Sequence, residues 1–165
     1  MTPATRRQDE AAMLDLLRAR YSFTGGNGPR WAFVPKVRSA AGFDASRTCD
    51  ALAFDLWPSA GLLIHGHEIK CSRADWLVEL RDPPKAETFI PYVDRWWIVA
   101  AERGIVRRDE LPPGWGLMEV RGGKIRVVQK SEHFIALPIP KTFLAAIMRA
   151  ATRREGGNHC GEETI

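Results

Sequence analysis

The residues best suited to do chemistry are two acids and a lysine: Asp50, Glu68 and Lys70. Two neighbouring carboxylates repel each other, and each raises the pKa of the other unless a cation offsets their charge. Mg²⁺ typically takes one or two carboxylates together with waters and a phosphate oxygen. A lysine two residues beyond the second acid can orient a water molecule or stabilise a developing negative charge. These residue types together favour hydrolysis of a phosphodiester bond.

The sequence around these residues predicts a β-hairpin. Residues 48–57 and 62–71 read as strands, and Pro58-Ser-Ala-Gly61 between them is typical of a turn. Side chains alternate between the two faces of a strand, and directly opposed residues have Cβ atoms about 4.5–5.5 Å apart. A turn centred on Ser59 therefore predicts these cross-strand pairs: Phe54 with Ile64, Leu52 with Gly66, and Asp50 with Glu68. Both carboxylates and Lys70 would then gather at one end of one face.

The other patterns in the sequence predict the elements that surround this hairpin. A helix follows Ser72, which forms a capping box with Asp75. The remaining predicted elements are a helix at 3–20, a strand at 31–38 with Pro35 at an edge or a bulge, a short helix at 85–90, strands at 95–101, 116–120 and 124–129, and a helix at 140–154. This order predicts one α/β domain over residues 1–154, a mixed β-sheet flanked by helices, with 155–165 as a flexible tail.

Composition sets the class of protein. The chain has 165 residues, of which 45% are hydrophobic and 27% charged, so one globular domain needs no disulfide or metal to hold it together. No run of about 18 apolar residues occurs, so we expect no membrane span. The N-terminus is polar, so we expect no signal peptide. Three irregularly spaced cysteines favour a reducing, cytoplasmic location. The net charge of +4 leans weakly toward a polyanionic partner such as DNA.

Three segments carry a family resemblance. They are Asp50-Ala-Leu-Ala-Phe-Asp55, His67-Glu-Ile-Lys-Cys-Ser-Arg-Ala-Asp-Trp76 and Tyr92-Val-Asp-Arg-Trp-Trp97. Together they resemble the MmcB-like DNA repair family, within the PD-(D/E)XK nuclease superfamily, over about residues 45–130. The resemblance implies a restriction-endonuclease-like fold and a Mg²⁺-dependent deoxyribonuclease, with Mn²⁺ as a substitute, whose product carries a 5′-phosphate. Asp50 follows Cys49, so the proline of the superfamily name is absent.

The resemblance also implies a role for each site residue. Asp50, Glu68 and the backbone carbonyl of Ile69 would ligate the metal, and Lys70 would serve the attacking water. The first helix of such proteins often supplies another acid, and Glu10 shares the helical stripe of Leu14, Leu17 and Tyr21. An equally good interpretation of Glu10 is a first-turn acid favoured by the helix dipole. Relatives often place a lysine and a tyrosine on the helix after the core motif, where Lys85 and Tyr92 could contact DNA, although Pro91 interrupts that helix. From their position just beyond the motif, Arg73 and Lys85 could also touch DNA phosphates, and solvated helix charges are an equally good interpretation of both.

Other interpretations of the same residues stay open. Glu68 and Lys70 can form an ordinary surface ion pair. Four residues on the opposite face of the hairpin suggest zinc, but their spacing fits buried thiols and partnered histidines better: Cys49, His65, His67 and Cys71. His67 could still line the edge of the site. The alternatives to a nuclease are a catalytically silent DNA-binding or repair-scaffold module on the same fold, and a plain partner-binding protein; a homodimer is possible in each case.

Overall fold

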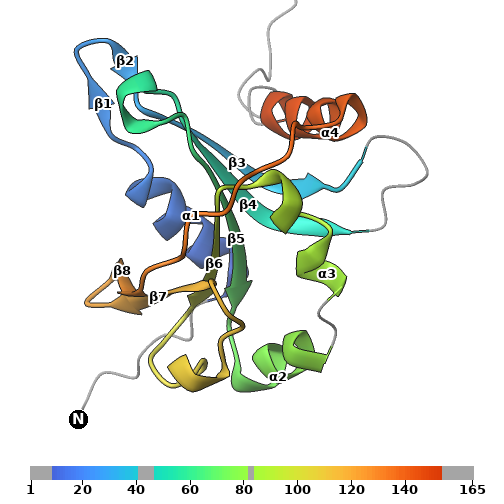
Figure 1. Ribbon diagram of the computed structural model, residues 1–165. Helices are drawn as coiled ribbons and strands as arrows, with labels where there is room; N and C mark the ends of the chain where they lie inside the picture. Colours follow the sequence, from blue (N-terminus) through green and yellow to red (C-terminus); the bar gives the residue numbers. More distant parts are fainter. Residues whose placement is uncertain (1–8, 41–46, 82–83, 154–165) are drawn as a thin grey trace, which may run out of the picture.

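The structure is a computed structural model that describes residues 9–40, 47–81 and 84–153 (Figure 1). The predicted tail at 155–165 and the first part of the predicted N-terminal helix lie outside these ranges. Within them, no helix is both long and apolar enough to cross a membrane.

A six-stranded mixed sheet forms the centre of the structure, as predicted. Its strand order is β3-β4-β5-β6-β7-β8, antiparallel over the first three strands, parallel from β5 to β7, and antiparallel again at the β7–β8 hairpin. The strands are β3 (Trp31–Arg38), β4 (Thr48–Asp55), β5 (Ile64–Lys70), β6 (Arg95–Ala100), β7 (Gly116–Arg121) and β8 (Lys124–Gln129). A small antiparallel ribbon, β1 (Thr24–Gly25) and β2 (Gly28–Pro29), lies between α1 and β3 along the chain.

The register of the β4–β5 hairpin confirms the predicted pairing as far as the ladder extends. Phe54 faces Ile64 and Leu52 faces Gly66, and the last pair of the ladder is Ala51 with His67. A 3₁₀ turn (η1, Pro58–Ala60) lies in the connection between the strands. Pro35 lies on β3, the edge strand, where its missing N–H removes no inner ladder bond.

Helices cover both faces of the sheet (Figure 1). Helix α1 (Glu10–Arg20) lies on one face, and α2 (Arg73–Arg81), α3 (Pro84–Glu87) and α4 (Lys141–Thr152) lie on the other. Two further 3₁₀ turns are η2 (Ile90–Tyr92) and η3 (Arg108–Glu110). Helix α1 begins later than the sequence predicted because Asp9 caps it, its Oδ1 accepting the N–H of Ala12 at 2.8 Å. Ser72 caps α2 as predicted, accepting the N–H of Asp75.

The apolar core has one layer on each side of the sheet. Beneath α1, the ring of Tyr21 contacts Trp31 and Phe33 of β3. On the other face, Phe89 stacks on Trp96 and also meets Phe143 of α4. Gly66 is required there, because a Cβ on it would lie 2.5 Å from the Trp96 ring. These layers hold the C-terminal half of β5, with Glu68 and Lys70, rigidly in the sheet.

Candidate functional site

The candidate site lies where β4 separates from β5. Beyond the Ala51–His67 pair the ladder ends, and the carboxylate of Asp50 takes its place: Oδ2 accepts the N–H of Ile69 at 2.8 Å. Both backbone groups of a strand residue point toward the same neighbouring strand. The carbonyl of Ile69 is therefore directed to the side of Asp50, whereas that of Lys70 turns to the other side and accepts the N–H of Ala101.

Lys36 brings a cation to this opening. Its Nζ lies 2.9 Å from Oδ1 of Asp50 and also forms an ion pair with Glu10. The β3–β4 register places Lys36 opposite Asp50, yet its φ of +53° is in the left-handed region. That conformation costs a non-glycine residue about 1–3 kcal/mol, and such strain concentrates at functional sites. Glu10 is half-exposed at the rim and reaches this cluster through its ion pair with Lys36; its role as a site acid stays a prediction.

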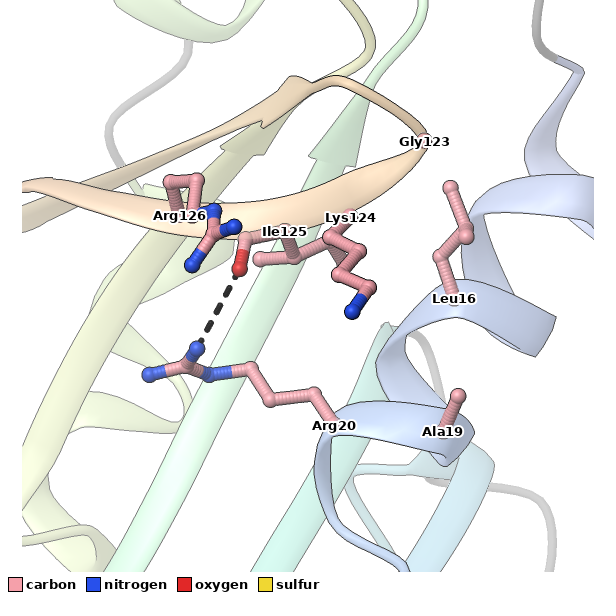
Figure 2. A pocket seen from close by; sticks show the side chains of 7 residues that line it. All are labelled: Leu16, Ala19, Arg20, Gly123, Lys124, Ile125 and Arg126. Carbon is pink, nitrogen blue, oxygen red and sulfur yellow. Dashed lines mark hydrogen bonds between the residues drawn. The ribbon is translucent and has the colours of Figure 1, made fainter.

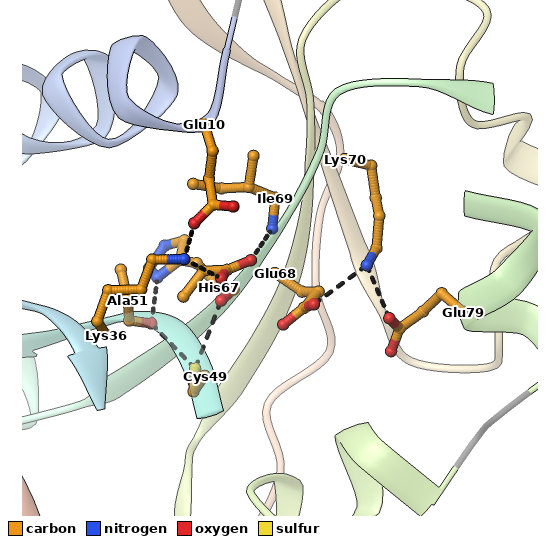
Figure 3. A network of polar contacts seen from close by, with 10 residues as sticks. Glu10, Lys36, Cys49, Ala51, His67, Glu68, Ile69, Lys70 and Glu79 are labelled. Atoms are coloured by element: carbon orange, nitrogen blue, oxygen red, sulfur yellow. Dashed lines mark hydrogen bonds and ion pairs between the residues drawn. The ribbon is translucent and has the colours of Figure 1, made fainter. Parts of the chain in front are cut away.

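Lys70 forms a second, buried cluster beside the first (Figure 3). Its Nζ lies 3.1 Å from Oε1 of Glu68 and 2.7 Å from Oε2 of Glu79. The side chains of all three are less than 8% exposed, so the pair of Glu68 and Lys70 is not a surface ion pair. Glu79 comes from α2, which follows β5 directly and points this residue back at the strand end.

Sequence reasoning missed Glu79. Of the residues on α2, the apolar Leu77 is 37% exposed, whereas the charged Glu79 is buried together with Trp76. The available signal was helical spacing: Glu79 lies three residues after Trp76 and so shares its face. A buried glutamate requires a partner, and Lys70 is the partner that the fold supplies.

The carboxylates of Asp50 and Glu68 both act electrostatically on the thiol of Cys49. Cys49 is fully buried, and its Sγ contacts the carbonyl oxygens of Ala51 and His67 at 3.3 and 3.4 Å. Burial raises the pKa of the Cys49 thiol, and the negative charges of Glu68 and Asp50 raise it further. Both acids therefore act on one small region at the end of the hairpin.

The donor chemistry fits a hard divalent cation. Four carboxylates surround two ammonium groups, which leaves a formal excess of two negative charges. Asp50, Glu68 and the Ile69 carbonyl offer only oxygen, the ligand type that Mg²⁺ prefers. Among the described residues, no three acidic, histidine or cysteine side chains converge as a ready-made metal cage. One or two carboxylates completed by water, the usual Mg²⁺ environment, match this arrangement.

The histidines belong to the other face of the hairpin and take no part in this cluster. Nε2 of His67 lies 2.8 Å from the Tyr21 hydroxyl beneath α1, and Nδ1 of His65 accepts the indole N–H of Trp97 at 3.2 Å. Burial is the main cause that lowers the pKa of His67 to about 3 and that of His65 to about 4. The prediction of partnered histidines is confirmed. The ring of His67 is fully buried, and its place at the edge of the site stays a prediction.

The three residues expected to contact DNA have different surroundings. Arg73 donates two hydrogen bonds to Glu110 and one to the carbonyl of Ile105, at 3.0 Å. These bonds from Arg73 are the main reason that the pKa of Glu110 falls to about 2. The ring of Tyr92 packs 5.7 Å from that of Phe143. The side chain of Lys85 lies outside the described part of the chain. The DNA contacts of all three stay predictions.

Comparison with known proteins supports the fold. No family model matches the sequence, and no curated protein matches it. A solved protein of unknown function from Silicibacter pomeroyi superposes with a TM-score of 0.59 at 19% identity, covering 97% of this chain and 99% of the other. This likeness shows a shared α/β fold and gives no information about activity.

Proposed function

We propose that the chain is a restriction-endonuclease-like, metal-dependent nuclease that hydrolyses DNA phosphodiester bonds, in DNA repair or in bacterial or phage DNA processing. One observation carries the proposal: the carboxylate of Asp50 accepts the N–H of Ile69, the residue between Glu68 and Lys70, at the opening between β4 and β5. Asp50 is thereby joined to the strand end that carries Glu68, the Ile69 carbonyl and Lys70. The resemblance of these segments to the MmcB-like DNA repair family supports DNA as the substrate.

The residues that would hold the metal are Asp50, Glu68 and, through its carbonyl, Ile69. Mg²⁺ or Mn²⁺ there would polarise a phosphate oxygen and lower the pKa of a bound water. The excess negative charge around the opening favours such a cation. The ammonium of Lys36, between Asp50 and Glu10, already occupies part of this negative region, so Lys36 must give way or share the space.

The protein groups divide the remaining work. The ammonium of Lys70 lies beside Glu68, where it can orient the attacking water and stabilise the charge that develops on the phosphate oxygens. Glu79 acts through Lys70 as a positioning residue, because its bond of 2.7 Å fixes the direction of the amine. Glu10 is half-exposed and adds negative charge at the rim, toward the solvent.

One observation favours the second candidate, a silent DNA-binding or repair-scaffold module. Each lysine of the site already lies between two carboxylates: Lys70 between Glu68 and Glu79, and Lys36 between Asp50 and Glu10. A cluster whose lysines are already held by ion pairs in this way can serve structure alone. Such a module would bind DNA without cutting it.

The deciding experiment incubates supercoiled plasmid and labelled linear DNA with the protein in Mg²⁺, in Mn²⁺ and in EDTA. The nuclease cuts with either metal and not in EDTA, and Asp50→Asn stops cutting while DNA binding in EDTA persists. Asp15→Asn is the matched control, because this acid is exposed on α1 and pairs only locally, with Arg18. Binding without cutting would support the silent module, and no salt-dependent binding would contradict both candidates.

A further inference from the structure

A pocket of about 350 Å³ lies between α1 and β8, outside the candidate site (Figure 2). Its volume is within the range of small-ligand pockets, about 300–1,000 Å³. It is lined by Leu16, Ala19, Arg20, Gly123, Lys124, Ile125 and Arg126.

The pocket has a strongly positive lining. Three of its seven lining residues, Arg20, Lys124 and Arg126, carry a positive charge, and none is acidic. The nearest acid on the same hairpin is Glu119, the cross-strand neighbour of Arg126, and it accepts a hydrogen bond from the guanidinium of Arg121 at 2.7 Å. Three cations around one space repel each other unless an anion offsets them, so this lining is suited to an anionic ligand.

The geometry also holds one of the cations in place. The guanidinium of Arg20 donates to the carbonyl of Ile125 at 3.3 Å, across the gap between α1 and β8. A guanidinium fixed in this way keeps further N–H donors for a phosphate at little entropic cost. Leu16 and Ile125 add an apolar wall against which a sugar or base can pack.

We propose that this pocket binds a backbone phosphate of a nucleic-acid strand, an inference that rests on the proposed function. Lys124 and Arg126 are exposed, so an extended strand can enter from solvent. Arg20 and Glu10 lie at opposite ends of α1, about 15 Å apart along the helix axis. A strand lying along α1 would therefore contact the pocket a few nucleotides from the opening at Asp50.

The test measures binding of fluorescent single- and double-stranded oligonucleotides in EDTA, which prevents cutting. Lys124→Gln/Arg126→Gln is compared with Lys130→Gln/Lys141→Gln, which removes the same charge from exposed residues outside the pocket lining. We expect the pocket variant to lose at least about fivefold in affinity. The plot of log affinity against log salt concentration should become shallower by about 1.4–1.8 in slope, because two phosphate contacts are lost. The control variant should retain the wild-type slope.

Three outcomes would overturn the inference: equal losses in the two double variants, no loss in either, or displacement of the oligonucleotide by a free mononucleotide at micromolar concentration. The last would assign the pocket to a nucleotide. Thermal unfolding of each variant checks that the fold is intact. Because the readout is binding without metal, a protein that binds through the pocket but never cuts would leave this inference standing while the proposed nuclease fails.

Discussion

The backbone N–H of Ile69 donates to Oδ2 of Asp50 at 2.8 Å, so the first acid of the site is hydrogen-bonded to the middle residue of Glu68-Ile69-Lys70. This bond replaces the strand pairing that stops one residue earlier, at Ala51 and His67. The carboxylate therefore has both a structural and a proposed chemical role, and substitutions can separate the two.

Asp50→Ala leaves the buried N–H of Ile69 without its acceptor, which costs about 1–3 kcal/mol. For a domain of this size the unfolding temperature should fall by about 2–4 °C for each kcal/mol. Asp50→Asn keeps a carbonyl oxygen at the same place and should unfold within a few degrees of the wild type. Both variants should fail to cut DNA. Scanning calorimetry of the two proteins in EDTA makes the comparison, and equal loss of stability would contradict the structural role.

Lys70→Met leaves Glu68 and Glu79 buried without their shared cation, and we expect a loss of about 3–5 kcal/mol in the free energy of unfolding. Adding Glu79→Gln removes one of the two stranded charges and should restore part of that loss. Urea unfolding in EDTA measures both. Lys36→Met is the comparison, because the side chain of Lys36 is 43% exposed. We expect it to lower the free energy of unfolding by about 1 kcal/mol or less. A double variant less stable than Lys70→Met would show that the pairing is wrong.

Lys36→Gln should strengthen metal binding, because the wild-type ammonium competes for the region between Asp50 and Glu10. Since Lys36 is partly exposed, we expect a gain of roughly fivefold in Mn²⁺ affinity, on the order of 1 kcal/mol. Calorimetric titration with MnCl₂ gives the value, and Lys141→Gln, which removes the same charge from an exposed residue of α4, is the control. Unchanged or weaker binding in Lys36→Gln would mean that this lysine does not compete with the metal.

Stability should fall as pH drops below about 6.5. Burial lowers the folded-state pKa of His65 to about 4 and of His67 to about 3, so the unfolded chain takes up protons first and gains stability relative to the fold. Each histidine can contribute a slope of up to about 1.4 kcal/mol per pH unit, continuing down to its folded-state pKa.

Urea unfolding between pH 6.5 and 5 measures this slope before most carboxylates titrate. His65→Gln should reduce this slope, because it removes one of the two buried neutral histidines. The assignment to buried neutral histidines would be wrong if His65→Gln kept the full wild-type slope.

Local patterns in the sequence were enough to predict most of the sheet. Strand alternation and the turn after Trp57 fixed the pairing of Phe54 with Ile64 and of Leu52 with Gly66, because one face of a hairpin must be apolar. The strands at Trp31–Arg38 and Lys124–Gln129 were predicted with their observed bounds. Asp50 and Glu68 were expected as the next cross-strand pair, but the ladder ends at Ala51 and His67, and Asp50 accepts the N–H of Ile69 instead.

The site residues that were missed depend on tertiary structure. Nothing in the sequence signals the left-handed backbone at Lys36, because lysine has no preference for it and only the opposing Asp50 and Glu10 explain where the ammonium goes. Glu79 was missed because a charged residue in a helix is usually solvated, and its burial depends on Lys70 lying opposite. Contacts between residues far apart in the sequence therefore determine both the position of the Lys36 ammonium and the burial of Glu79.

The proposed nuclease requires a divalent cation at the end of the β4–β5 hairpin, and the anomalous signal of Mn²⁺ in a crystal of the protein can locate it. We expect one peak bonded to carboxylate oxygens of Asp50 and Glu68 and to the Ile69 carbonyl, at about 2.1 Å by analogy with Mg²⁺. Asp50→Asn crystals should lose that peak. A saturating soak that leaves this position empty, with Lys36 and Lys70 still in their ion pairs, would show that the hairpin end does not bind the metal.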